Sequence, residues 1–398
     1  MKNPKIRFKG YTDDWEQRKL DDWGTFYYGR SCPKWSVTED AIIPCIRYGE
    51  LYTKFGAKID RVYSYTNMSP ENLRFSKGTE VLIPRVGEDP MDYNHCTWLS
   101  IPNVAIGEMI SVFNTDNSPL FTAIMFNATL QNEFAMRVEG GSVTNLYFEK
   151  LKNIEVSFPH KDEQEKIATY FESLDHLITL HQRKCEQTKI LKKYMLQKMF
   201  PQKGEKVPEI RFDGFTDDWE QRKFSDVAEY RNGKAHENEI DDDGEYIVVN
   251  SKFVSTNGEI KKFSNAQNEP LYENEIAFVL SDVPNGRAIA RTFLIDKSGK
   301  YTLNQRIAGI TPHEDTDPYY LHIKMNRNAY FLKFDDGNKQ TNLSIKDVLN
   351  YEDMYPNYKE QQKIGNYFRS LDHLITLHQR KCEELKNIKK FMLQNMFV

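Results

Sequence analysis

The sequence predicts an α+β protein with two mixed α/β domains joined by two long antiparallel coiled-coil helices, related by a pseudo-two-fold internal repeat. Three observations predict this fold. Two segments recur almost unchanged, the longer one has the apolar spacing of a coiled-coil helix, and short runs typical of β-strands lie between them. The 398 residues suffice for two or three domains. We expect a first domain at 1–160, a helix at 161–200, a linker at 201–209, a second domain at 210–357 and a second helix at 358–398.

The duplication is the strongest signal in the chain. Residues 6–20 match residues 210–224 at twelve of fifteen positions, and residues 163–200 match residues 360–397 at 28 of 38. Between these landmarks the two halves diverge almost completely. A near-constant frame around a variable body is expected of one scaffold that presents two different binding surfaces.

The longer repeated segment predicts a helix in each half. Its apolar residues recur at a spacing of four, three and four, which indicates a coiled-coil seam. We expect Asp162 with Glu165, and Asn357 with Glu360, to cap the helices. A helix of 38 residues spans roughly 55 Å. The expected seam residues are Ile167, Phe171, Leu174 and Ile178 in the first helix and Ile364, Phe368, Leu371 and Ile375 in the second.

Each variable body predicts short strands and one helix. The helices are expected at 119–137 and 318–334. If a two-fold axis relates the halves, the segment at 6–20 lies just after the second helix, so that Met1 and Val398 are near each other and the helices are antiparallel. The expected strands are 80–86, 108–113, 245–250, 275–280 and 290–295.

Composition excludes several classes of protein. With 54 Lys and Arg against 58 Asp and Glu, the net charge is −4, which excludes a wholly basic nucleic-acid binder but not local basic faces. The sequence contains no run of 18 apolar residues, and its first ten residues lack the apolar h-region of a signal peptide, so we expect neither a membrane span nor secretion by the usual signal. Five cysteines without a CxxC pair indicate free thiols in a reducing compartment. We therefore expect a cytoplasmic protein.

Motifs for catalysis are weak or missing. The sequence has no GxxxxGK[ST] and no GxGxxG motif. Residues 317–320 read DPYY, which lacks the second proline of an adenine-methyltransferase motif, and residues 259–261 have an E-x-K spacing that is common by chance. We expect no catalytic residues.

A metal site between the helices stays an open alternative. His181 and Cys185 share one helix face, and His378 with Cys382 repeats the pair. Antiparallel helices could join them as a Cys₂His₂ site. Seam packing is the more ordinary role for such residues, so no metal is expected.

The doubled plan resembles the specificity (S) subunit of Type I restriction-modification systems. The residues that carry the resemblance are EQEKI at 163–167 and EQQKI at 360–364, each followed by SLDHLITLHQRKCE, together with the TNL triplets at 144–146 and 341–343 and LNQRIAGITP at 303–312. The resemblance covers essentially the whole chain.

The resemblance implies a non-catalytic reader of double-stranded DNA. Each variable body would be a target-recognition domain for one half of a bipartite, asymmetric sequence. The paired helices would set the gap and dock two methyltransferase (M) subunits, and motor-nuclease (R) subunits would join them. S-adenosylmethionine, ATP and Mg would then be held by the partner subunits and no cofactor by this chain. The alternatives are a protein-binding adaptor with a coiled-coil spacer and a detached recognition part of a fused enzyme.

Base-edge readers are expected among Arg, Lys, Asn and Gln on loops or helix starts, beside aromatic residues. A true bidentate reader contributes about 1–3 kcal/mol at one base position. The candidate DNA-binding residues are Arg30, Lys34, Arg47, Tyr48, Arg61, Arg85 and Asn94 in the first body, and Lys234, Asn250, Lys252, Arg287, Arg291, Gln305 and Arg306 in the second.

Overall fold

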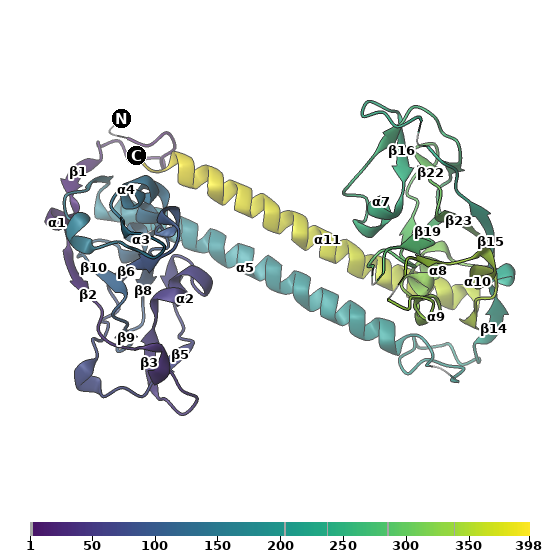
Figure 1. The fold of residues 1–398 in the computed structure, drawn as a ribbon, viewed down its shortest axis with the longest axis horizontal. Helices are drawn as coiled ribbons and strands as arrows, with labels where there is room; N and C mark the ends of the chain where they lie inside the picture. Colours follow the sequence, from purple (N-terminus) through teal and green to yellow (C-terminus); the bar gives the residue numbers. More distant parts are fainter. Residues whose placement is uncertain (1–2, 203, 237, 285, 338) are drawn as a thin grey trace. The chain divides into compact units, whose positions relative to one another are not determined.

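The computed structural model describes residues 3–398 apart from 203, 237, 285 and 338. It divides into two compact units. The first unit comprises Met1–Gln182 and Arg380–Val398, and the second comprises Arg183–Gln379. Two long helices, α5 (Lys161–Lys198) and α11 (Tyr358–Asn395), contribute one half to each unit. Each unit therefore combines one globular body with a pair of helix halves (Figure 1).

The body of the first unit is built on a five-stranded sheet in the order β2-β10-β6-β8-β4. Strands β6 and β10 are buried along almost their whole length, which accounts for their apolar sequences. The strands are β2 (Thr25–Tyr28), β10 (Ile110–Asn114), β6 (Glu80–Pro84), β8 (Thr97–Leu99) and β4 (Lys58–Ile59). Around them lie β1 (Glu16–Lys19), β3 (Ile43–Ile46), β5 (Ser64–Thr66), β7 (Val86–Gly87), β9 (Ala105–Ile106), β12 (Thr144–Asn145), β13 (Glu155–Phe158), α2 (Tyr48–Thr53), α3 (Pro119–Thr129) and α4 (Gln131–Ala135).

The body of the second unit has a four-stranded sheet in the order β15-β23-β19-β21 and a second sheet in the order β17-β16-β22-β18. The first sheet contains β15 (Ala228–Asn232), β23 (Ile307–Pro312), β19 (Ile276–Val279) and β21 (Thr292–Leu294). The second contains β17 (Phe263–Ser264), β16 (Tyr246–Val249), β22 (Tyr301–Leu303) and β18 (Pro270–Leu271). Around them lie β14 (Glu220–Lys223), β20 (Ser281–Asp282), β24 (Thr341–Asn342), β25 (Glu352–Tyr355), α7 (Ser251–Ser255), α8 (Pro318–Met325) and α9 (Ala329–Leu332).

The two bodies share one topology although their sequences diverge. The order β2-β10-β6-β8 corresponds to β15-β23-β19-β21. In each body a further pair of strands is parallel, β3 with β9 and β16 with β22. The repeated segment near each body's start pairs antiparallel with the strand before the long helix, β1 with β13 and β14 with β25. The internal repeat of the sequence is therefore an internal repeat of the fold.

The EQxKI motif attaches the repeated N-terminal segment to each helix. Arg7 forms a two-bond ion pair with the buried carboxylate of Glu163, with Nε–Oε1 and Nη2–Oε2 distances of 2.7 Å. Arg211 and Glu360 repeat the pair at 2.8 Å for both bonds. The Gln164 amide donates to the Pro159 carbonyl. The equivalent bond runs from Gln361 to Pro356.

The long helices are antiparallel. Within the first unit Lys389 of α11 pairs with Asp175 of α5. Within the second, Lys192 of α5 pairs with Asp372 of α11 at 2.6 Å. The predicted proximity of the chain ends is confirmed for the described residues, because the Ile6 N–H donates to the Asn395 carbonyl at 2.9 Å. Met1 itself lies outside the described residues.

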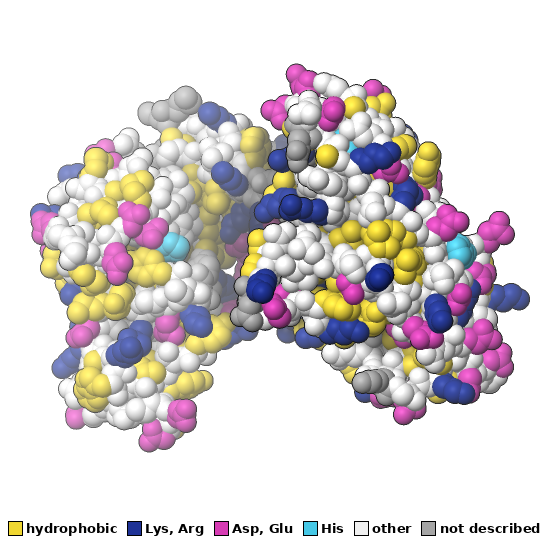
Figure 2. Space-filling view, turned by 45° about the vertical axis from the view of Figure 1, so that its right-hand side comes forward, with side chains coloured by type: hydrophobic (Ala, Val, Ile, Leu, Met, Phe, Trp, Pro, Cys, Tyr) yellow, Lys and Arg dark blue, Asp and Glu magenta, His cyan; other side chains and the backbone are white. Residues whose placement is uncertain are grey.

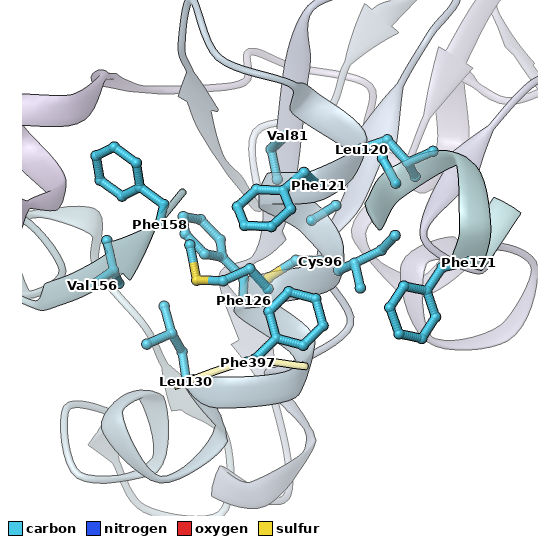
Figure 3. Packing of buried hydrophobic residues seen from close by; sticks show 14 of the residues in the cluster. Val81, Cys96, Leu120, Phe121, Phe126, Leu130, Val156, Phe158, Phe171 and Phe397 are labelled. Atoms are coloured by element: carbon cyan, nitrogen blue, oxygen red, sulfur yellow. The ribbon is translucent and has the colours of Figure 1, made fainter. Parts of the chain in front are cut away.

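Both ends of the chain enter the core of the first unit. The Phe397 ring lies 5.8 Å from Phe121, 5.9 Å from Phe171 and 6.4 Å from Trp15. Figure 3 shows Phe397 in this group, beside residues from α3 and α5. Of the expected seam residues, Ile375 is half-buried and the other seven are buried.

Two expectations about helices are wrong. The single helices expected at 119–137 and 318–334 are each broken in two, because Leu130 leaves helical geometry in the first and Arg327 adopts a φ of +56° in the second. Asp162 lies inside α5 and does not cap it. The capping role of Asn357 is confirmed, since its side chain accepts a bond from the Glu360 N–H.

None of the helices that the structure describes is long and apolar enough to cross a membrane. All five cysteines are free and buried.

Candidate nucleic-acid interface

In the first unit, the loop at residues 107–109 joins three segments of the body. The Gly107 N–H donates to the Ile46 carbonyl at 2.9 Å, and the Arg30 N–H donates to the Ile106 carbonyl at 2.8 Å. The Arg85 N–H donates to the Met109 carbonyl at 3.2 Å. These backbone bonds place Arg30, Arg47 and Arg85 around one loop. We call this region the first reading surface; it comprises Arg30, Lys34, Arg47, Tyr48, Arg85 and residues 107–109.

Lys34, Arg47 and Tyr48 line a hollow of about 210 Å³ together with residues 107–109. Arg47 immediately precedes α2, and its N–H donates to the Glu50 carboxylate at 2.9 Å, which fixes the backbone there. No ion pair with a described residue engages Arg30, Lys34 or Arg47 in the structure. These cations therefore remain available for an anionic ligand.

Arg85 lies at the base of this surface. Its guanidinium stacks over Tyr28 at 4.9 Å and over Tyr147 at 5.8 Å. One Nη donates to the Glu108 carbonyl at 3.3 Å, while the buried Nε has no partner among the described residues. Arg85 thus supports the loop and keeps one unused donor.

The second unit repeats the arrangement around the loop at residues 304–306. The Lys234 N–H donates to the Leu303 carbonyl at 3.1 Å, and the Asn304 N–H donates to the Val249 carbonyl at 3.2 Å. The Leu280 N–H donates to the Arg306 carbonyl at 3.0 Å, as Arg85 does to Met109. We call this region the second reading surface; it comprises Lys234, Asn250, Lys252 and residues 304–306.

A glycine makes the close approach possible in each surface. A Cβ on Gly29 would lie 2.0 Å from the Gly107 carbonyl oxygen, and a Cβ on Gly233 would lie 2.0 Å from that of Asn304. Real Cβ atoms do not come this close, so only glycine fits at these positions without a shift. The basic residue that follows each glycine is held against the loop as a result.

The two surfaces carry unlike side chains on this common backbone. Gly107, Glu108 and Met109 occupy the loop of the first, and Asn304, Gln305 and Arg306 that of the second. In the second surface Lys252, Gln305 and Arg306 are exposed. Lys234 pairs with Glu269 at 2.9 Å. Asn250 accepts a bond from the Phe253 N–H at 2.9 Å and so caps α7.

Four sequence-predicted residues lie elsewhere in their units. Arg61 stacks over Tyr63 at 5.5 Å and lines a groove beside α5. The Asn94 amide donates to the Asn127 carbonyl at 3.1 Å, a bond that ties a loop to the end of α3. Arg287 and Arg291 belong to the segment between β20 and β21.

The sequence-based list missed two exposed or basic residues. Trp35 follows Lys34 in the first reading surface and is 71% exposed, so its ring is open to a ligand. Trp35 could have been found from the sequence, because an aromatic residue beside the candidate Lys34 meets the criterion used for the other candidates. Arg327 was missed because it follows α8, and no local motif connects it to Arg287 and Arg291.

His181, Cys185, His378 and Cys382 were the candidate ligands of a metal site. Among the residues that the structure describes, no group of three or more His, Cys, Asp or Glu side chains is placed to hold a metal ion. Cys185 and Cys382 are each about 93% buried, as expected for small apolar residues in a packed helix pair.

Charge is mixed over the visible surface. On the face in Figure 2, Lys and Arg side chains are interspersed with Asp and Glu, and exposed apolar side chains form several patches. Recognition of an anionic polymer must therefore depend on local basic clusters rather than on the overall charge.

Two bodies of one topology, with unlike polar side chains at one equivalent surface, define a paired recognition scaffold. The family model described as "Type I restriction modification DNA specificity domain" matches residues 12–189 and 216–387. The chain belongs to this family and is a specificity subunit, the non-catalytic component that recognises DNA sequence.

Two relatives carry the same description, and solved structures share the fold. The MjaVIII specificity subunit of Methanocaldococcus jannaschii is 22% identical, with 67% of each chain covered. The MjaIX specificity subunit of the same organism is 24% identical over 96% of this chain and 92% of the relative. The S subunit structure from M. genitalium has a TM-score of 0.65 at 14% identity and covers 100% of this chain and 99% of its own. A structure described as concerning complex assembly of a Type I system has a TM-score of 0.51 at 14% identity, with 96% and 97% covered.

Proposed function

We propose that each body reads one half of a bipartite, asymmetric DNA target through its own reading surface. The carrying observation is that one backbone arrangement presents Arg30, Arg47 and Tyr48 in the first unit but Lys234 and residues 304–306 in the second. Arg, Asn and Gln side chains distinguish base pairs by different hydrogen bonds in the major groove. Unlike side chains on a common scaffold therefore support two unlike half-sites.

The long helices would set the gap between the half-sites. A helix of 38 residues spans roughly 55 Å. Half-sites one helical turn apart are separated by about 34 Å, so a helix of this length is long enough to bridge them. Because the helix length is fixed by its sequence, the gap would be fixed as well. This is the basis for assigning the spacer role to the repeated segment.

The helices also carry exposed apolar residues at repeated positions, where we place the docking of two methyltransferase subunits. In the first unit Leu177, Ile388 and Phe391 are 40%, 36% and 55% exposed. Their counterparts at the 197-residue offset, Leu374, Leu191 and Tyr194, are 41%, 43% and 48% exposed in the second unit. Exposed apolar side chains that recur at equivalent positions in both units support a protein interface there. We call these the first and second apolar triplets.

Catalysis would then belong to the partners. The methyltransferase subunits would hold S-adenosylmethionine, and the motor-nuclease subunits would use ATP and Mg. This chain would supply sequence recognition to both activities.

The proposal is tested by mapping methylated adenines in cells with and without this chain, with the methyltransferase subunit present in both. The expected result is the loss of one motif made of two unlike halves around a fixed gap. An unchanged map would contradict DNA recognition and favour a protein-binding adaptor.

Docking is tested separately by native mass measurement of the purified complex. Phe391→Ser and Tyr194→Ser each alter one apolar triplet, and each variant is expected to retain one methyltransferase subunit while the double variant retains none. Gln187→Ser, at an exposed position on α5, is the matched control. Two bound subunits in the double variant would contradict the placement.

A further inference from the structure

Three arginines from two separate segments converge in the second unit. Arg287 and Arg291 lie between β20 and β21, and Arg327 follows α8. The Arg291 Nε donates to the Arg287 carbonyl at 2.6 Å. The Arg327 guanidinium donates to the Ile289 carbonyl at 3.2 Å. These bonds bring Arg327 to the loop between β20 and β21 that carries Arg287 and Arg291, which we call the arginine loop.

The three arginines form no ion pair with any residue that the structure describes. Burial, followed by the charges of Arg327 and Arg287, lowers the pKa of Arg291. The nearby carboxylate of Asp282 instead accepts bonds from the Ala288 and Ile289 N–H groups, at 2.6 and 3.1 Å. The charges of Arg327 and Arg287 thus act on Arg291 without an ion pair among the described residues to offset them.

The arginine loop is held in an unusual conformation. Ala290 and Arg327 have φ values of +57° and +56°, and the Arg327 N–H donates to the Ala290 carbonyl at 2.7 Å. A Cβ on Gly286 would lie 2.0 Å from the Asp282 carboxylate. Left-handed backbone at non-glycine residues is costly and is found most often at functional sites. The loop is therefore built to keep the three cations together.

The first unit lacks this feature at the equivalent place. There Asn127 Oδ1 accepts a bond from the Cys96 N–H, as Asn326 Oδ1 does from Thr292 in the second. This match pairs Cys96 with Thr292 and so aligns residues 87–95 with residues 283–291. The first-unit segment carries Glu88, Asp89 and Asp92 and no arginine. The cationic cluster belongs to the second body alone.

We propose that Arg287, Arg291 and Arg327 form a clamp for backbone phosphates of the DNA duplex beside the half-site that the second body reads. This inference rests on the proposed function. Guanidinium groups bind phosphate oxygens with two parallel hydrogen bonds, and phosphate contacts fix the register of a protein on DNA without reading bases. Arg287 and Arg291 thus position the duplex, and base reading in this body is left to the second reading surface.

The test uses the assembled methyltransferase complex and a duplex that contains its own target. Affinity is measured against salt concentration for the unmodified complex, for Arg287→Gln, Arg291→Gln and Arg327→Gln, and for the triple variant. Each single variant is expected to reduce the slope of log K against log salt by about 1, equally on target and non-target duplexes. Lys297→Gln, an exposed cation in the same unit, is the control and should keep the full slope. Thermal unfolding of each variant verifies that it folds.

Three results would overturn the clamp. A triple variant with the unmodified slope excludes phosphate contacts. A relaxed preference at one base position identifies a base reader instead. A variant that loses a methyltransferase subunit but keeps the unmodified slope of log K against log salt would show that the three arginines form a protein interface. Absence of selective DNA binding by the unmodified complex is distinguishable from these and would overturn the proposed function itself.

Discussion

Gly29 and Gly233 determine how closely each reading surface packs. Because a Cβ on Gly29 would lie 2.0 Å from the Gly107 carbonyl oxygen, Gly29→Ala must displace backbone rather than a flexible side chain. We expect a loss of about 1–3 kcal/mol of stability and weaker recognition of one half-site. Gly141→Ala, where nothing lies within 4 Å of the added Cβ, is the control. Thermal unfolding and methylation at the target measure both effects, and equal behaviour of the two variants would contradict the argument.

The buried ring of His322 should make the free energy of unfolding of the second unit depend on pH. Burial, and then the charge of Lys192, lowers the pKa of His322 from 6.5 to about 4. The unfolded chain therefore binds a proton between these pH values that the folded chain does not, so stability falls as the pH falls from 6.5 toward 4. We expect His322→Gln to lose less thermal stability between pH 7 and pH 5 than the natural chain. An identical loss in both chains would contradict the assignment.

Residue type alone could not separate readers from structural polar groups. Asn94 met the same criteria as Arg47, yet its side chain donates to the backbone carbonyl of Asn127, away from the first reading surface. Asn250 lies in the second reading surface, but its Oδ1 accepts a bond from the Phe253 N–H and caps α7. The first bond joins residues that only the fold brings together, and the second depends on where α7 begins. Neither bond could be predicted from the sequence alone. That basic residues would form the first reading surface could be predicted from the sequence. That they meet around residues 107–109 could not.

The long helices were predictable because local spacing and repetition both specify them. The EQxKI motif was visible in the sequence, but its role was not, since the Arg7–Glu163 pair spans 156 positions. The break after α3 was missed because an apolar run buried against a sheet gives little periodic signal of where a helix ends. The break after α8 falls at the polar residues 326–328, where Arg327 adopts a left-handed backbone that arginine rarely takes.

Phe397, which follows the end of α11, should contribute strongly to the stability of the first unit. Phe397 is 9% exposed and packs on rings from three segments of the first unit. Removing a buried aromatic ring costs about 3–5 kcal/mol, so Phe397→Ala should lower the free energy of unfolding by about 3 kcal/mol. Val398→Ala, at a 41% exposed position, should stay within about 0.5 kcal/mol. Denaturant unfolding followed by tryptophan fluorescence measures both, and similar values would contradict the role of Phe397.

The chain as a whole is a repeated frame that carries two bodies. The frame was predictable because its two copies are nearly identical in sequence. The common topology of the bodies was not, because their strands match only in backbone pairing, as in β2-β10-β6-β8 and β15-β23-β19-β21. A buried strand requires apolar residues but not particular ones, so the fold persists where sequence identity does not. Specificity can therefore differ between bodies without a change of scaffold.

The central claim is that the two reading surfaces act independently on two half-sites. It is tested most directly by replacing Asn304-Gln305-Arg306 with Gly-Glu-Met, the residues at 107–109, and mapping methylated adenines in cells that hold the methyltransferase subunit. We predict that one half of the methylated motif changes, while the other half and the gap stay as they were. A change in both halves, or an unchanged motif, would contradict the account.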